Sequence, residues 1–121
     1  MKSHEIEKNS ENRSFCPIAC TLDIVGDKWS LLIIRDLLMG KTRYDEFLNS
    51  PEKISTNILA ERLKKLEKHG ILTKEQYGNH ASRMNYRLTE KGQSLAKMLK
   101  EIIKWGLANI SGTAKSQISL K

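Results

Sequence analysis

The chain has 121 residues, of which 39% are hydrophobic and 29% charged, a size and balance that indicate one globular domain and exclude a disordered chain. Its formal net charge of +7 favours an acidic partner, most simply a nucleic acid. No apolar run is long enough to cross a bilayer and the first residues carry no secretion signal, so we expect a cytoplasmic protein. The chain also lacks a long amphipathic helix with a dense Lys/Arg face, so we expect no membrane binding.

The N-terminal part of the chain predicts a tail followed by a short helix. Residues 1–14 are rich in Lys, Glu, Asn and Ser, so we expect a flexible tail. Pro17 suits the first position of a helix, which makes Cys16 the expected N-cap of a helix that ends near Val25. Two apolar stripes run along it, one made of Ile18, Leu22 and Val25 and the other of Cys16, Cys20 and Ile24. One side should therefore pack on its own domain and the other on a second subunit.

A central core helix is expected between Gly26 and Gly40. Asp27 is its expected N-cap, and Lys28 is either a solvated lysine or a phosphate contact. Its apolar residues are dense enough for burial on several sides: Trp29, Leu31, Leu32, Ile33, Ile34, Leu37 and Leu38. Residues 41–43 then predict an extended connection. Residues 44–49 predict a short helix that turns Tyr44, Phe47 and Leu48 to the core.

The stretch from Ile54 to Gly70 predicts a helix with one apolar and one polar face. Pro51 stops the preceding helix, Ser55 is a good N-cap, and Gly70 suits the left-handed position after the C-terminus. Leu59, Leu63 and Leu66 share the apolar face, while Asn57, Glu61, Lys64 and Lys68 project away from it. The polar face is either simply solvated or enters the major groove of DNA. A short helix, a tight turn and this helix form a helix-turn-helix by arrangement.

The C-terminal half predicts a β-hairpin and a last helix. Residues 71–77 and 83–88 alternate in polarity, so they form either an ordinary solvent-facing hairpin or a wing with basic groups at Lys74, His80, Arg83 and Arg87. Thr89 should cap a helix that runs to about Ile110, with residues 111–121 as a tail. Its wide apolar stripe comprises Leu95, Met98, Leu99, Ile102, Ile103, Trp105, Gly106 and Ile110.

The expected fold is therefore mainly α with a small β-hairpin (α+β): a winged helix-turn-helix over residues 15–110. One small domain cannot cover both the last apolar stripe and two sides of the first helix, so we expect the N- and C-terminal helices to build a homodimer. The residues expected at this dimer interface are Cys20, Ile24, Leu99, Ile102 and Trp105.

In this order and spacing, the chain resembles the HxlR family of bacterial winged-helix transcription regulators, relatives of the MarR group. The resemblance rests on Cys16-Pro17, Gly26-Asp27-Lys28-Trp29, residues 40–47, Ile54-Ser55, Leu59, Leu63, Leu66-Glu67, Gly70, Tyr86, Leu88-Thr89, Gly92 and Trp105. It implies a homodimer on a palindromic operator, and a cysteine at the position of Cys16 that in several members senses quinones, aldehydes or oxidants. Two departures concern Asp27, where the family commonly has a second glycine, and Ala81-Ser82, where it commonly has proline before the basic wing residue.

Cys16 has two interpretations. At a helix N-terminus the dipole and the free amides stabilise the reactive thiolate, whereas Phe15 and a dimer contact would make it an inert buried thiol. Cys20 lies one turn further on, where an intact helix is poorly suited to a bridge with Cys16, so a disulfide would cross the dimer or need local unfolding.

Catalytic and metal chemistry are not indicated. His4, His69 and His80 are scattered without the spacing of a zinc site, so we expect no metal and no cofactor. The chain offers no phosphate-cradling glycine loop and no nucleophile with a base beside it, so we expect no enzyme.

The favoured function is a transcription regulator that binds double-stranded DNA. The expected DNA contacts are Arg43, Ser55, Thr56, Asn57, Lys64, Lys74, His80 and Arg83. A small electrophile is the candidate inducer, acting through Cys16 with Cys20. The alternative is a winged-helix dimer that binds a ligand or another protein and does not bind DNA.

Overall fold

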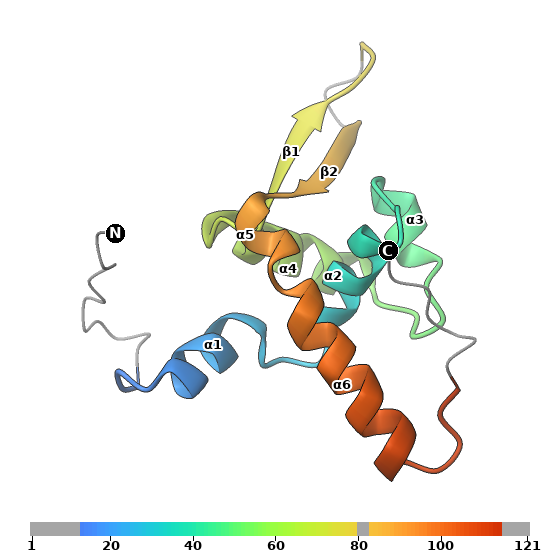
Figure 1. The fold of residues 1–121 in the computed structure, drawn as a ribbon. Coiled ribbons are helices and arrows are strands. Elements are labelled where there is room, and N and C mark those ends of the chain that lie inside the picture. Colours follow the sequence, from blue (N-terminus) through green and yellow to red (C-terminus); the bar gives the residue numbers. More distant parts are fainter. Residues whose placement is uncertain (1–12, 80–82, 115–121) are drawn as a thin grey trace.

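The computed structural model describes residues 13–79 and 83–114, which form a winged helix-turn-helix (Figure 1). Six helices and one antiparallel hairpin follow in the order α1 (Pro17–Val25), α2 (Ser30–Leu38), α3 (Tyr44–Leu48), α4 (Thr56–Lys68), β1 (Leu72–Gln76), β2 (Met84–Leu88), α5 (Glu90–Gln93) and α6 (Ala96–Asn109). The hairpin projects from the body of the domain, and α6 runs away on the opposite side (Figure 1). The predicted mainly helical fold with a small hairpin is confirmed. No helix in the described ranges is long and apolar enough to cross a membrane.

The ends of α4 are those that the sequence predicts. The Ser55 hydroxyl accepts a hydrogen bond from the Ile58 amide at 3.3 Å, which caps the N-terminus. Gly70 has a φ of +74°. The amides of Gly70 and Ile71 donate to carbonyls of the last helical turn at 3.0 and 2.9 Å, a pairing that fixes where the helix stops.

The leucine face of α4 lies in the centre of the core, as predicted. Leu59, Leu63 and Leu66 are between 0% and 3% exposed. They belong to one core together with buried side chains from other helices, the hairpin and the segments that connect them: Val25, Ile33, Ile34, Phe47, Ile54, Ile71, Leu72, Tyr86 and Leu99. Because one side of α4 is fully used by this core, its opposite side must face outward.

The hairpin is joined to the helical body through the segment before α3. β1 and β2 pair from Leu72 opposite Leu88 to Gln76 opposite Met84. The Tyr86 amide donates to the Thr42 carbonyl at 2.7 Å, and Arg43 forms an isolated bridge with Asn85. Residues 41–43 therefore form the predicted extended connection and continue the sheet beside β2.

Two boundaries differ from the sequence-based expectation. Helix α2 begins at Ser30 instead of directly after Asp27, although the Asp27 carboxylate does cap it by accepting from the Trp29 and Ser30 amides at 3.0 Å each. The expected last helix is divided into α5 and α6. A Cβ at Gly92 would lie 2.1 Å from the Ile71 carbonyl oxygen, so α5 packs backbone to backbone against the start of β1 and α6 leaves in a new direction.

Candidate nucleic-acid interface

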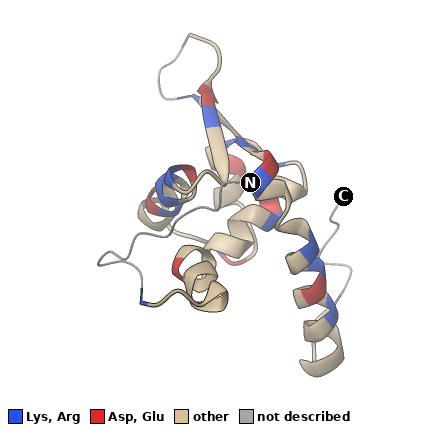
Figure 2. Cartoon of the chain, turned by 60° about the vertical axis from the view of Figure 1, so that its left-hand side comes forward, with Lys and Arg blue, Asp and Glu red and all other residues tan. Residues whose placement is uncertain are grey.

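The outward face of α4 is polar and accessible. Ser55, Thr56, Asn57 and Lys64 are all exposed, and Asn57 and Lys64 lie two turns apart on the side opposite the leucines. Figure 2 shows Lys and Arg on α4 and on the hairpin, interspersed with a few acidic residues. The major groove is wide enough to admit an α-helix. Small polar residues at the start of α4 and a lysine further along suit contacts with base edges and phosphates there.

A polar network around the buried side chains of Asp36 and Ser50 fixes the turn that precedes α4. Arg35 donates two hydrogen bonds to the Glu52 carboxylate at 2.8 and 2.9 Å, and this lowers the pKa of Glu52. The Ser50 hydroxyl donates to the buried carboxylate of Asp36, and Lys41 Nζ donates to the Ser50 oxygen at 3.1 Å. These bonds satisfy the buried polar groups and hold the α3–α4 turn against α2.

Two further contacts orient α4 itself. The Tyr44 hydroxyl of α3 donates to the Thr56 carbonyl in the first turn of α4 at 2.6 Å. Arg62 Nε donates to Asp27 Oδ2 at 2.8 Å, which ties the middle of α4 to the start of α2. Burial raises the pKa of Asp27, but the hydrogen bonds from Ser30, Arg62 and the backbone amides outweigh it and hold this pKa well below its usual value. Asp27 therefore remains ionised at neutral pH.

The remaining basic residues predicted to contact DNA lie beside the hairpin. Arg43 is exposed, with guanidinium nitrogens 3.8 Å from Asp45 and 3.9 Å from Glu46. Lys74 Nζ lies 3.8 Å from Glu67 across the start of the wing. Such long, exposed ion pairs contribute little stability, so these cations are available to phosphates. Arg83 is exposed immediately before β2, whereas His80 and the Ala81-Ser82 departure lie outside the described residues.

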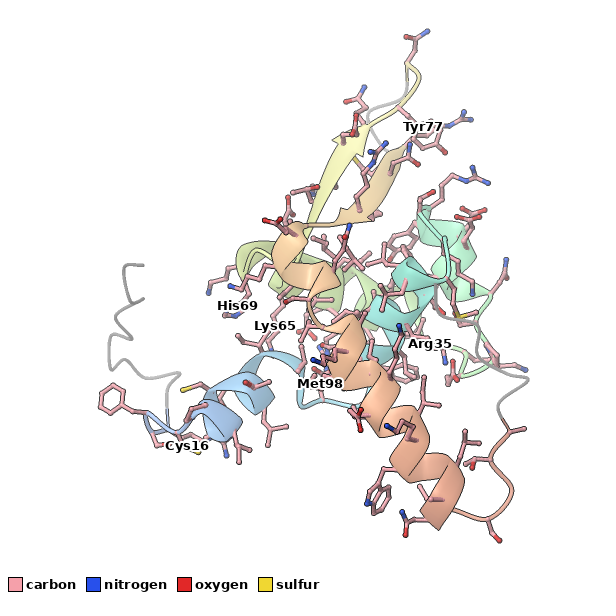
Figure 3. The ribbon with its side chains drawn as sticks, in the orientation of Figure 1. Cys16, Arg35, Lys65, His69, Tyr77 and Met98 are labelled. Carbon is pink, nitrogen blue, oxygen red and sulfur yellow. The ribbon has the colours of Figure 1, made fainter. Side chains whose placement is uncertain are left out.

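The two cysteines are free thiols on α1, far from the hairpin. Cys16 is exposed at the N-cap of α1, and Figure 3 shows it at the outer end of that helix, on the opposite side of the molecule from Tyr77. Cys20 is partly buried, and its Sγ lies 3.3 Å from the Ser14 carbonyl oxygen. Within one chain, Cys16 is thus an accessible thiol and not a core residue.

The residues predicted at a dimer interface divide into two groups. Ile102 and Trp105 of α6 are 47% and 63% exposed in the single chain, which leaves them accessible to a second copy. Leu99 is only 7% exposed and belongs to the chain's own core, so it offers little surface to a partner, and its place at a dimer interface stays a prediction. Ile24 also packs against this core, and Cys20 is partly buried.

The exposed apolar side of α1 is instead the stripe that carries Ile18 and Leu22. These side chains are 71% and 51% exposed, and Phe15 before the helix is 60% exposed. The C-terminal end of α1 packs on the domain, where Val25 is buried in the core and Ile24 lies against it, so Val25 leaves the stripe that Ile18 and Leu22 keep exposed.

Sequence reasoning named Asp27 as a cap but missed its contact with Arg62. The two residues are 35 positions apart, and no local pattern pairs them. The one feature of the sequence that pointed to this contact was Asp27 itself, an acidic residue where the family that the chain resembles commonly has glycine. Among the residues that the structure describes, no three His, Cys, Asp or Glu side chains gather closely enough to hold a metal ion.

Comparison with known proteins agrees with this geometry. Residues 24–114 match the family described as HxlR-like helix-turn-helix. The chain is 34% identical over 101 residues to YdeP, an HTH-type transcriptional regulator of Bacillus subtilis strain 168, covering 84% of this chain and 79% of that protein. YybR of the same strain is 33% identical over 98 residues, covering 81% and 78%.

Solved structures show the same relationship. The redox regulator HypR in its reduced form superimposes with a TM-score of 0.73 at 31% identity, covering 79% of this chain and 95% of that one. The reduced form of the transcriptional regulator YodB from B. subtilis gives a TM-score of 0.67 at 30% identity, covering 84% and 100%. The chain belongs to the HxlR-like helix-turn-helix family of transcriptional regulators.

Proposed function

We propose that this regulator binds a palindromic operator in double-stranded DNA as a homodimer, with α4 in the major groove and the β1–β2 hairpin alongside. The observation that carries the proposal is that α4 has two distinct faces: its leucines are buried, and its Asn57 and Lys64 are exposed. A helix held so firmly by its apolar side can present its polar side in one orientation. The proposal implies a cytoplasmic protein, requires no cofactor and assigns no catalysis.

The expected contacts fall into two classes. Asn57 can pair with adenine through two hydrogen bonds, while Ser55 and Thr56 reach a base edge or a phosphate near the helix start. The cations expected to neutralise phosphates or enter the adjacent minor groove are Arg43, Lys64, Lys74, His80 and Arg83. Electrostatic contacts supply affinity and base contacts supply sequence preference, so the two classes are separable by mutation.

Dimer formation is supported by the apolar side chains that the single chain leaves in water. Ile18 and Leu22 of α1 and Ile102 and Trp105 of α6 are all more than 45% exposed. Large exposed apolar residues gathered on two terminal helices indicate an interface. A two-fold pairing would present two copies of α4 to the half-sites of a palindrome.

Thiol sensing is the regulatory part of the proposal. Cys16 is accessible at a helix N-terminus, and the similar structure HypR is named a redox regulator. A quinone would react by addition of the Cys16 thiolate to a ring carbon, forming a C–S bond while a quinone oxygen takes up a proton. Cys20 is the second thiol, available for a disulfide across the dimer or after local unfolding of α1.

The experiment that tests this function is recovery of genomic fragments on the full-length protein at moderate salt, followed by footprinting. We expect an inverted repeat with half-sites about 10 base pairs apart, bound by two chains. Failure to retain any DNA would refute the proposal and favour the alternative, a winged-helix dimer that binds a ligand or another protein.

A further inference from the structure

Glu61 is an acidic residue in the middle of the face that the proposed function directs at DNA. It lies one turn after Asn57 and three residues before Lys64, and its side chain is 68% exposed. A carboxylate at this place is repelled by phosphates and weakens sequence-independent binding. Glu61 is therefore either a solvated charge that lowers the affinity for DNA or a residue that distinguishes one base from another.

Neighbouring residues hold this carboxylate in place. Arg62 Nη1 contacts Glu61 Oε1, while Nε of the same guanidinium donates to Asp27 at 2.8 Å. Arg62 is only 20% exposed and Asp27 21%, and Asp27 is itself fixed by the amides at the start of α2. Glu61 is thus connected through Arg62 and Asp27 to the rigid helical body.

This arrangement lowers two costs of bringing a carboxylate into a groove. The guanidinium offsets part of the negative charge, and a side chain already held in place loses less conformational freedom on binding. In the described part of the chain, no hydrogen bond or ion pair ends on Glu61 Oε2, so this oxygen is left to accept from DNA.

We propose that Glu61 is a specificity-determining residue that accepts a hydrogen bond from the N4 amino group of a cytosine in each half-site. An ionised carboxylate only accepts, and cytosine presents an amino donor in the major groove. Guanine and thymine present acceptors there that would repel it, and adenine sets its N7 acceptor beside its N6 amino group. The inference rests on the proposed DNA binding and adds which base is required at one position of each half-site.

The geometry also predicts where this cytosine lies. Four residues of α-helix span about 6 Å, which corresponds to roughly two base pairs along the duplex. The cytosine should therefore lie roughly two base pairs from the adenine that Asn57 is proposed to read. A solvated charge would produce no base preference at that position.

The test is selection from a randomised duplex pool by wild type, Glu61→Gln and Glu101→Gln. The control removes the same charge from α6, where Glu101 pairs with Lys104 one turn further on at 3.2 Å. We expect wild type and control to require the cytosine. Glu61→Gln should lose this preference by about tenfold in favour of adenine, because a Gln amide can both accept and donate.

Three results would overturn the inference. A consensus shared by all three proteins would refute it while leaving the proposed function intact. A uniform gain in affinity of Glu61→Gln for every sequence, without a changed base preference, would identify Glu61 as a solvated charge. Absence of any wild-type consensus would remove the proposed sequence-specific function together with this inference.

Discussion

Replacing Asp27 by alanine would remove four hydrogen bonds at the point where α1, α2 and α4 meet. The carboxylate accepts from the amides of Trp29 and Ser30 at 3.0 Å, from the Ser30 hydroxyl at 2.6 Å and from Arg62 at 2.8 Å. Loss of a helix cap costs about 1 kcal/mol, and loss of a charge-assisted bond to a largely buried arginine about 1.5 to 3 kcal/mol. We therefore expect Asp27→Ala to lower the free energy of unfolding by about 2 to 4 kcal/mol.

The assay is chemical and thermal unfolding followed by circular dichroism. For a domain of this size the loss corresponds to a fall in Tm of roughly 10 to 20 °C. The matched control is Asp45→Ala, whose carboxylate is 75% exposed and 3.8 Å from Arg43, and which should change stability by less than about 0.5 kcal/mol.

The pH dependence separates the charge of Asp27 from its packing. The native pKa of Asp27 is lowered below the value of about 3.9 in the unfolded chain. Its stabilisation is therefore complete above about pH 5 and is lost as the pH falls, because the unfolded state takes up the proton first. The difference between wild type and Asp27→Ala should be constant near neutrality and shrink in acid. An equal difference at about pH 3 and pH 7, or no difference at either, would refute the reasoning.

Four further predictions concern DNA binding and its regulation. Asn57→Ala should weaken operator binding by about 1 to 3 kcal/mol per half-site with little effect on random DNA, and equal losses on both would argue against base contact. Lys64→Ala and Arg83→Ala should each lower affinity for all sequences and flatten the salt slope by about 0.9 per lost phosphate contact; slopes that match wild type would mean that another face binds. Cys16→Ser should abolish the effect of a thiol-reactive quinone on operator affinity, and a response equal to that of wild type would exclude Cys16 as the sensor. Trp105→Glu should convert the proposed dimer to a monomer in sedimentation, and a mass equal to that of a wild-type dimer would place the interface elsewhere.

The sequence alone determined where the principal helices lie and which way α4 faces. Ser55, Gly70 and Pro17 act on backbone groups within a few residues, so their effect is readable from local order. The spacing of Leu59, Leu63 and Leu66 fixes one face of a helix, whatever packs against it. The HxlR resemblance followed from many such local features in a fixed order.

The tertiary structure alone decided what those helices touch. Leu99 and Ile102 belong to the same apolar stripe in the sequence, but the core takes in the first and leaves the second 47% exposed. The contact from Asp27 to Arg62, and through it to Glu61, joins residues more than 30 positions apart, which no local pattern can pair. Periodicity gives the direction of a side chain relative to its own helix axis, whereas burial and ion pairing depend on how far neighbouring helices extend across it.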